Sequence, residues 1–197
     1  NIPQYLDLLF TKANTILLKV SPMLDISQGL SELDHVKTVH IVAVNNEVKE
    51  LLFLMEHGFS GAVSLHTSNI QKDSEQLFKG TKEEAINATA NVSEPLTYLY
   101  EPNAAIMKSG MFNLITGAYQ VNKLHQHTHL YTSNELVEFP GKRFKINGIT
   151  ESYYVVNSLK FFLCGNQSKS RKSSSACFWF PLFKRSRFEI KKRPGNW

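Results

Sequence analysis

The alternation of short β-rich runs with amphipathic stretches in the first 70 residues constrains the fold of this chain most. Three apolar runs bounded by turn residues predict strands, at residues 15–20, 38–44 and 61–70. Helices are predicted at residues 3–13 and 45–58, with a shorter candidate at 30–36. Strands that alternate with helices along the chain indicate an α/β sheet with covered faces.

The helix predicted at 45–58 has the strongest local signals. Asn45 or Asn46 can cap its start, where Glu47 suits the helix dipole. Gly58 can end it. Its apolar stripe consists of Val48, Leu51, Leu52 and Met55. The pattern therefore predicts a surface helix between the second and third strands.

The second half of the chain has a different organisation. Residues 71–95 are polar and end at Pro95, which predicts a linker or surface excursion with a candidate helix at 81–88. Residues 103–119 predict a helix with Asn103 as its cap. Further strands are predicted at 97–102, 128–133 and 142–149, and 151–163 begins as a strand. These elements indicate a small α+β unit.

The net charge of +5 conceals two segments of opposite charge. Residues 160–197 carry ten Lys or Arg and one acidic residue, which gives +9, whereas residues 1–159 carry twelve and sixteen, which gives −4. A pI near 9.1 is typical of nucleic-acid binders, but here it reflects only the tail.

The remaining composition excludes several classes. No apolar run approaches about 18 residues, so no membrane span is predicted. Cys164 and Cys177 fit neither a disulfide framework nor a zinc spacing, which favours a reducing, cytoplasmic compartment. The chain starts at Asn1, which fits a true start farther upstream.

Three quoted stretches carry a family resemblance: "LLKVSPMLDI", "VHIVAVNNEVKELLF" and "YLYEPNAAIMKSGMF". In this order and spacing they resemble the class I AdoMet-dependent methyltransferases with a C-terminal ferredoxin-like, THUMP-like region, found mainly in Bacteroidetes-type bacteria. The resemblance implies the last strands of a Rossmann-like methyltransferase sheet, followed by a small α+β ferredoxin-like/THUMP-like domain. The implied division is 1–70 for the end of the methyltransferase domain, 71–95 for a linker, 96–160 for the accessory domain and 161–197 for a basic tail.

The resemblance also implies that the chain is a fragment, because the family's full chains look about twice as long. Residues 15–20 would be the fifth strand of the sheet, and 38–44 and 61–70 the sixth and seventh. The chain has no G-x-G-x-G loop and no Asn/Asp-Pro-Pro-aromatic motif. S-adenosylmethionine (AdoMet) is therefore expected as the cofactor of the full-length family, and none is expected to bind this fragment.

The tail departs from the family pattern. Residues 161–197 include the serine-rich "SKSRKSSSA" and show no clear period. Two interpretations stay open, a frameshift near residue 163 and a genuine disordered basic tail.

Candidate substrate-side residues follow the strand at 15–20. Ser21, Pro22 and Asp25 lie just beyond its carboxyl end, where open α/β sheets bind ligands. Asp25 could act as a base or contact substrate, but it could equally cap the next element. Lys19 would lie inside a buried strand, where a charge requires a partner. Glu47 is a further substrate candidate, with the helix-cap interpretation as its alternative.

The candidate RNA-contacting residues are basic. The four candidates are Lys108, Lys142, Arg143 and Lys145. The resemblance to THUMP-type regions favours RNA as a partner, whereas the sixteen acidic residues of the body argue against it. His125, His127 and His129 would share one strand face, but no acidic or cysteine partner is near in sequence, so no metal site is predicted.

The predicted function is part of an AdoMet-dependent methyltransferase whose accessory domain presents substrate. The alternative is a non-catalytic nucleic-acid-binding module.

Overall fold

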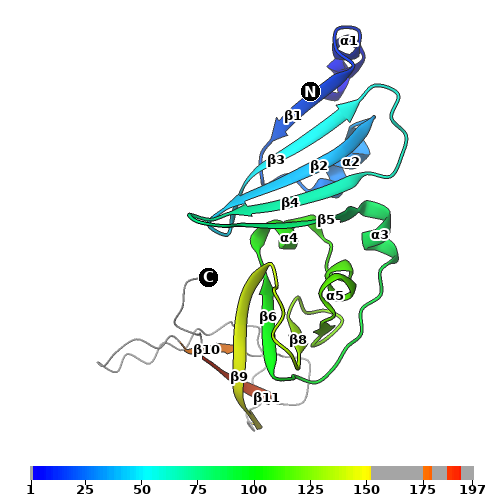
Figure 1. Cartoon of the computed structure of the whole chain (residues 1–197). Helices are drawn as coiled ribbons and strands as arrows, with labels where there is room; N and C mark the ends of the chain where they lie inside the picture. The colour runs from blue at the N-terminus through cyan, green and yellow to red at the C-terminus, as the bar shows by residue number, and fades with distance from the viewer. Residues whose placement is uncertain (1, 152–174, 179–185, 192–197) are drawn as a thin grey trace, which may run out of the picture. The chain divides into compact units, whose positions relative to one another are not determined.

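The structure is a computed structural model that describes residues 2–151, 175–178 and 186–191 (Figure 1). The chain divides into two compact units. The first comprises Asn1–Asn91 with Pro102–Gln120, and the second comprises Val92–Glu101 with Val121–Trp197. The domain boundaries expected from the resemblance stay predictions.

A five-stranded sheet forms the centre of the first unit, in the order β1-β3-β2-β4-β5 (Figure 1). Its strands are β1 (Thr15–Val20), β2 (Val36–Val44), β3 (Glu47–Glu56), β4 (Ser64–Ile70) and β5 (Glu75–Thr81). β2 and β4 pair in parallel, whereas β3 runs antiparallel to both β1 and β2. β1, β2 and β4 therefore point the same way, and β5 runs against them.

The helices of this unit are short. They are the 3-10 turn η1 (Ile2–Tyr5) and helices α1 (Leu6–Phe10), α2 (Ile26–Glu32), α3 (Lys82–Asn87), α4 (Ala104–Ser109) and α5 (Leu114–Tyr119). α2 packs closely on the sheet, since a Cβ at Gly29 would lie 2.8 Å from the Phe53 ring. α4 contacts β2, β3 and β4, and Tyr119 of α5 stacks on Phe78 of β5. One sheet face thus forms the core with these helices, through residues such as Val39, Ile41, Leu51, Phe53, Met55 and Leu65.

Several predicted elements are confirmed. The strands at 15–20 and 38–44 are β1 and β2, and β4 lies inside the predicted 61–70. The candidate helix at 81–88 is α3, whose capping box joins Thr81 and Glu84. The helix predicted at 3–13 is η1 and α1. The candidate at 30–36 is mostly wrong, because α2 ends at Glu32 and β2 begins at Val36.

The helix predicted at 45–58 is wrong, because this segment forms strand β3. Asn45 and Asn46 have φ angles of +50° and +64°, so they form the two central residues of a tight hairpin turn. Asparagine tolerates this left-handed conformation better than most residues. The turn reverses the chain, so that β3 pairs antiparallel with β2. Leu51, Phe53 and Met55 are then buried at the two-residue spacing of a strand.

Two further predictions need correction. The linker expected at 71–95 contains strand β5 and helix α3. The single helix expected at 103–119 is divided into α4 and α5 at Gly110, whose φ of +76° ends α4 in the left-handed conformation.

The second unit contains a sheet in the order β10-β11-β9-β6-β8-β7. Its strands are β6 (Tyr98–Pro102), β7 (Asn122–Lys123), β8 (Tyr131–Ser133), β9 (Gly141–Glu151), β10 (Ser175–Phe178) and β11 (Ser186–Lys191). The strands predicted at 97–102 and 142–149 are confirmed, while that at 128–133 is shorter. The predictions for residues 161–197 fall mostly outside the described residues. Within that range, β10 and β11 pair with each other, and β11 pairs with β9.

Across the described ranges, no helix has the length and apolar character that a membrane crossing requires.

Candidate functional site

One edge of the first-unit sheet gathers most of the predicted substrate-side residues. β2 and β4 end there side by side at Val44 and Ile70. β1 points the same way and ends at Val20, which is level with Ile41 through β3, three residues before the end of β2. We call this the carboxyl edge, defined by residues 19–25, 45–50 and 69–70. Open α/β sheets bind ligands outside the carboxyl ends of their strands, so this edge is the primary candidate site.

Lys19 lies on this edge in an exposed position. Its strand β1 is the outermost of the sheet, so the expectation of a buried strand is wrong. The Lys19 side chain is 67% exposed, and its Nζ lies 2.8 Å from Glu50 Oε1 on β3. Glu50 was missed in the sequence because the segment was interpreted as a helix. The register of β1 with β3 brings the two charges together.

Ser21, Pro22 and Asp25 form the turn that leads from β1 into α2. Ser21 Oγ accepts the backbone N–H of Met23 at 3.2 Å, which is a local turn contact. Asp25 caps α2, since its Oδ1 accepts the Gln28 N–H at 3.0 Å. This hydrogen bond is the main cause that lowers the pKa of the Asp25 carboxyl, with smaller contributions from Lys108 and Lys82. Asp25 is therefore held as a carboxylate in a helix cap, and its role toward substrate stays a prediction.

Glu47 begins β3 and is not in the first turn of a helix, as the sequence suggested. Its side chain is 72% exposed and pairs with Lys49 at 2.7 Å. The structure therefore brings Glu47 to the same edge as Lys19 and Ser21, but as a member of a second exposed ion pair.

A buried amide network stabilises the carboxyl edge, and two of its members, Asn69 and Gln76, were not predicted from the sequence. Asn69 Oδ1 accepts the backbone N–H of Asn46 at 2.9 Å, and Asn69 Nδ2 donates to Gln76 Oε1 at 3.1 Å. Asn103 Nδ2 donates to the same Gln76 oxygen at 3.1 Å. Asn69 is fully buried and Asn103 is 2% exposed. The network thus joins the β2–β3 turn, β4, β5 and the start of α4.

The same network positions helix α4. Asn103 Oδ1 caps this helix by accepting the Ile106 N–H at 3.1 Å, which confirms the predicted cap. Asn46 Oδ1 accepts the Ala104 N–H at 2.8 Å. The "YLYEPN" motif therefore contains the end of strand β6 and the cap of helix α4, and hydrogen bonds connect this cap to the sheet. The sequence contained one signal for Asn69. It follows Thr67 by two residues on a strand, so the two side chains point to the same, buried face of the sheet.

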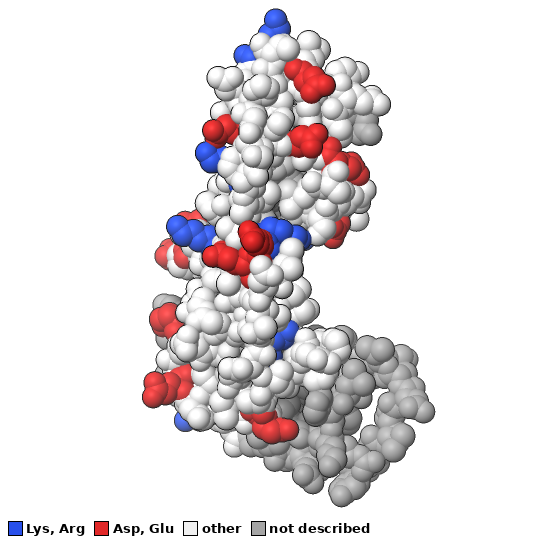
Figure 2. All heavy atoms as spheres, turned by 90° about the vertical axis from the view of Figure 1, so that its right-hand side faces the viewer, with Lys and Arg blue, Asp and Glu red and all other residues white. Residues whose placement is uncertain are grey.

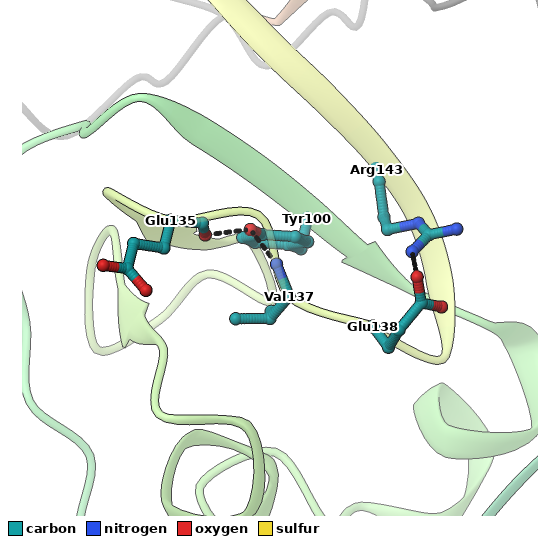
Figure 3. Close-up of polar contacts among 5 residues, drawn as sticks. All are labelled: Tyr100, Glu135, Val137, Glu138 and Arg143. Atoms are coloured by element: carbon teal, nitrogen blue, oxygen red, sulfur yellow. Dashed lines mark hydrogen bonds and ion pairs between the residues drawn. The ribbon is translucent and has the colours of Figure 1, made fainter.

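The nucleic-acid candidates divide between the two units. Lys108 lies on α4 of the first unit, whereas Lys142, Arg143 and Lys145 lie on β9 of the second. Lys142 Nζ is 2.9 Å from Glu101 Oε2, and Arg143 Nη1 is 2.5 Å from Glu138 Oε1 (Figure 3). On the face in Figure 2, Lys and Arg side chains are interspersed with Asp and Glu. Neutralising partners make a basic RNA-facing patch less effective.

A buried tyrosine organises the neighbouring loop of the second unit (Figure 3). Tyr100 Oη lies 2.7 Å from Ser133 Oγ, donates to the Glu135 carbonyl at 2.9 Å and accepts the Val137 N–H at 3.2 Å. Its ring packs against Phe139 with centroids 5.0 Å apart. This hydroxyl fixes the loop that leads from β8 toward Glu138, the partner of Arg143.

The three histidines of "HQHTH" precede β8, so they do not share a strand face. The rings of His125 and His127 are 5.3 Å apart, and the His127 N–H donates to His125 Nδ1. In the part of the chain that the structure describes, no three His, Cys, Asp or Glu side chains are grouped to hold a metal ion.

Comparison with known proteins finds similarity to a family model and to a solved structure. A family model described as a ferredoxin-like domain matches residues 98–140. The chain is similar to the crystal structure of a "putative methyltransferase" from Porphyromonas gingivalis W83, with a TM-score of 0.81 and 25% sequence identity. The match covers 98% of this chain and 54% of that chain, so this chain spans about half the length of that protein. Comparison with curated proteins finds no match.

The fold is therefore mixed α/β with a ferredoxin-like domain, as the sequence predicted.

Proposed function

We propose that this chain is part of an AdoMet-dependent methyltransferase. Its first unit would contribute closing strands to the catalytic sheet, and its ferredoxin-like region would present the methyl acceptor, with RNA as the first class to test. The observation that carries the proposal is the similarity over 98% of this chain to about half of the structure titled "putative methyltransferase".

The sheet topology revises which strands take part. β1, β2 and β3 are consecutive in sequence and form the contiguous block β1-β3-β2. We therefore assign the closing strands to these three, and β4 follows them as an addition beyond β2. β1 is the outermost strand, and its outer edge is where a longer sheet would continue.

The residues of this chain do not fit AdoMet. Class I enzymes would hold it with a glycine-rich loop, and the ten glycines of this chain form no such loop. The charged groups of the carboxyl edge pair with one another, as Lys19 does with Glu50. The proposal therefore gives this chain the substrate side of a cleft, and no chemical step through AdoMet is derived.

Calorimetric titration with AdoMet tests the proposal. We expect no binding by this chain and binding by a polypeptide that extends the same reading frame upstream of Asn1. A glycine-rich loop should appear in that upstream frame when the locus is sequenced. AdoMet binding by this chain alone, or an upstream frame without such a loop, would contradict the assignment.

A non-catalytic nucleic-acid-binding module is the second candidate, favoured by the +9 charge of residues 160–197. The full chain and a variant ending at residue 159 can be compared for binding of a labelled RNA over a salt series. Binding that disappears with the tail and falls steeply with salt would indicate electrostatic attachment by the tail. Binding retained by the shorter variant would favour RNA presentation by the body.

A further inference from the structure

The sheet of the first unit has a second face, which we call the open face. Side chains along a strand point alternately to the two faces of a sheet, so the residues between the buried core residues point to the open face. Register places on it Leu17, Leu52, Leu54, Val42, Val44, Ile70, Leu77, His40 and His66. The contacts of α2 and α5 through Gly29, Gly80 and Phe78 are with the other face.

The open face carries apolar side chains from all five strands, interspersed with polar ones such as Ser64 and Ser68 of β4. Leu17 on one outer strand is 60% exposed, and Leu77 on the opposite outer strand is 63% exposed. Ile70 on β4 is 43% exposed, while Leu52 and Leu54 on β3 are half-buried. Sheets commonly bury such a face against a second sheet, and extended exposed apolar patches mark interaction surfaces.

The charges on this face are balanced within one copy. Lysines and glutamates occur on it or at its border as the pairs Lys19–Glu50, Lys37–Glu56 and Lys49–Glu47, with Lys79 and Glu75 on β5. A neutral surface of this kind can face a copy of itself without net repulsion. Two-fold interfaces require such self-complementarity, because each patch meets the same patch on the partner.

We propose that a second copy of this chain packs on the open face, forming a two-fold sheet-on-sheet dimer with His40 and His66 at its centre. His40 lies on β2, the middle strand, directly beside His66 on β4. Their ring centroids are 5.1 Å apart with an interplanar angle of 86°. A two-fold axis through this point brings the histidine pairs of both copies together.

This centre makes the dimer sensitive to acid. The titratable groups that face the pair are Lys79, opposite His66, and the ion pair of Lys19 with Glu50, beside Leu52. Lys79 adds positive charge, whereas the Glu50 carboxylate offsets the charge of Lys19. Partial burial, and less strongly the nearby His66, lower the pKa of His40 below its ordinary value of 6.5. Dimerisation buries the His40 imidazole further and favours its neutral form, so association is strongest above about pH 6.5 and weakens as the pH falls.

Sedimentation velocity over a concentration series of the full chain tests the proposal. At about pH 7.5 we expect a dimer, and Leu77→Asp is expected to shift the chain to monomer. Ile86→Asp is the matched control, since Ile86 is 71% exposed on α3 and should leave the dimer unchanged. Circular dichroism establishes that both variants are folded. Leu17→Asp on β1 provides a second disruption should Leu77→Asp fail to fold.

The acid response separates this interface from other modes of association. Between about pH 7.5 and pH 5 the dimer dissociation constant should rise at least about tenfold. The double variant His40→Asn/His66→Asn should lose most of this response. If the chain is monomeric at every concentration, no second copy packs on the open face and the proposal is overturned. A dimer that survives Leu77→Asp and Leu17→Asp overturns it as well.

Discussion

The buried amide network and the exposed ion pairs of the carboxyl edge are two polar regions of one sheet with opposite roles. Asn69 and Asn103 are buried and share Gln76, and both also bind backbone N–H groups. Lys19 and Glu50 lie in solvent and bind each other. Buried polar groups depend on their partners, whereas exposed charges exchange theirs for water at little cost. Stability should therefore depend on the amides, and the charged residues should be free to serve a ligand.

Replacement of Asn103 should have the largest effect on stability, because this buried side chain makes two hydrogen bonds. Asn103→Leu removes the cap of α4 and leaves Gln76 and the buried Ile106 N–H without this partner. The loss should be about 3 kcal/mol in the free energy of unfolding, measured by urea denaturation. Asn103→Asp should lose less, because it keeps the oxygen that caps the helix.

Asn87→Leu is the control for this measurement. Asn87 is exposed at the end of α3, and its replacement should change the free energy of unfolding by less than about 0.5 kcal/mol. Equal effects of Asn87→Leu and Asn103→Leu would show that the amide network does not stabilise the unit.

Tyr100→Phe extends the comparison to the second unit. The change deletes the hydroxyl that contacts Ser133, Glu135 and Val137 while it keeps the buried ring. We expect a loss of about 2 kcal/mol and faster hydrogen exchange at the Val137 amide, measured by NMR. Tyr98→Phe is the control, because Tyr98 is half-buried and its hydroxyl makes no hydrogen bond among the described residues. A similar loss in both variants would contradict a specific role for the Tyr100 hydroxyl.

Asn46→Val tests the turn that connects the network to the hairpin. Valine is β-branched and disfavours the φ of +64° that Asn46 adopts, so we expect a loss of about 1 to 2 kcal/mol. Asn46→Gly permits this conformation and should recover part of the loss. Thermal unfolding followed by circular dichroism compares the two variants. A fully stable Asn46→Val would indicate that the segment does not require a left-handed turn.

The hairpin also shows where prediction from sequence succeeds and fails. β1 and β2 were predictable, because each is a short β-rich run that ends at turn residues. The segment Leu51–Met55 is a continuous apolar run, which satisfies both helical and strand spacing. Two adjacent asparagines suit a helix cap as well as a hairpin turn, so only pairing with β1 and β2 decides the outcome.

The candidate site was predictable in location but not in chemistry. The Ser-Pro break after β1 marked the strand end, and the sheet places Lys19, Ser21 and Glu47 at one edge. Their partners Glu50 and Lys49 come from β3, which the sequence did not reveal as a strand. Asn69 is joined to Gln76 and Asn46 through strand register, and register is a tertiary property.

The smallest expected effect concerns Lys19 and Glu50. A double-mutant cycle with Lys19→Ala and Glu50→Ala should give a coupling free energy of about 0.5 kcal/mol, measured by urea denaturation, because both side chains are exposed. Added salt should reduce it further. A coupling above about 2 kcal/mol would place this pair with the buried amides and remove the contrast between the regions. With the small coupling, loss of substrate binding in either single variant would reflect contact with the ligand, because the sheet that carries both residues would be intact.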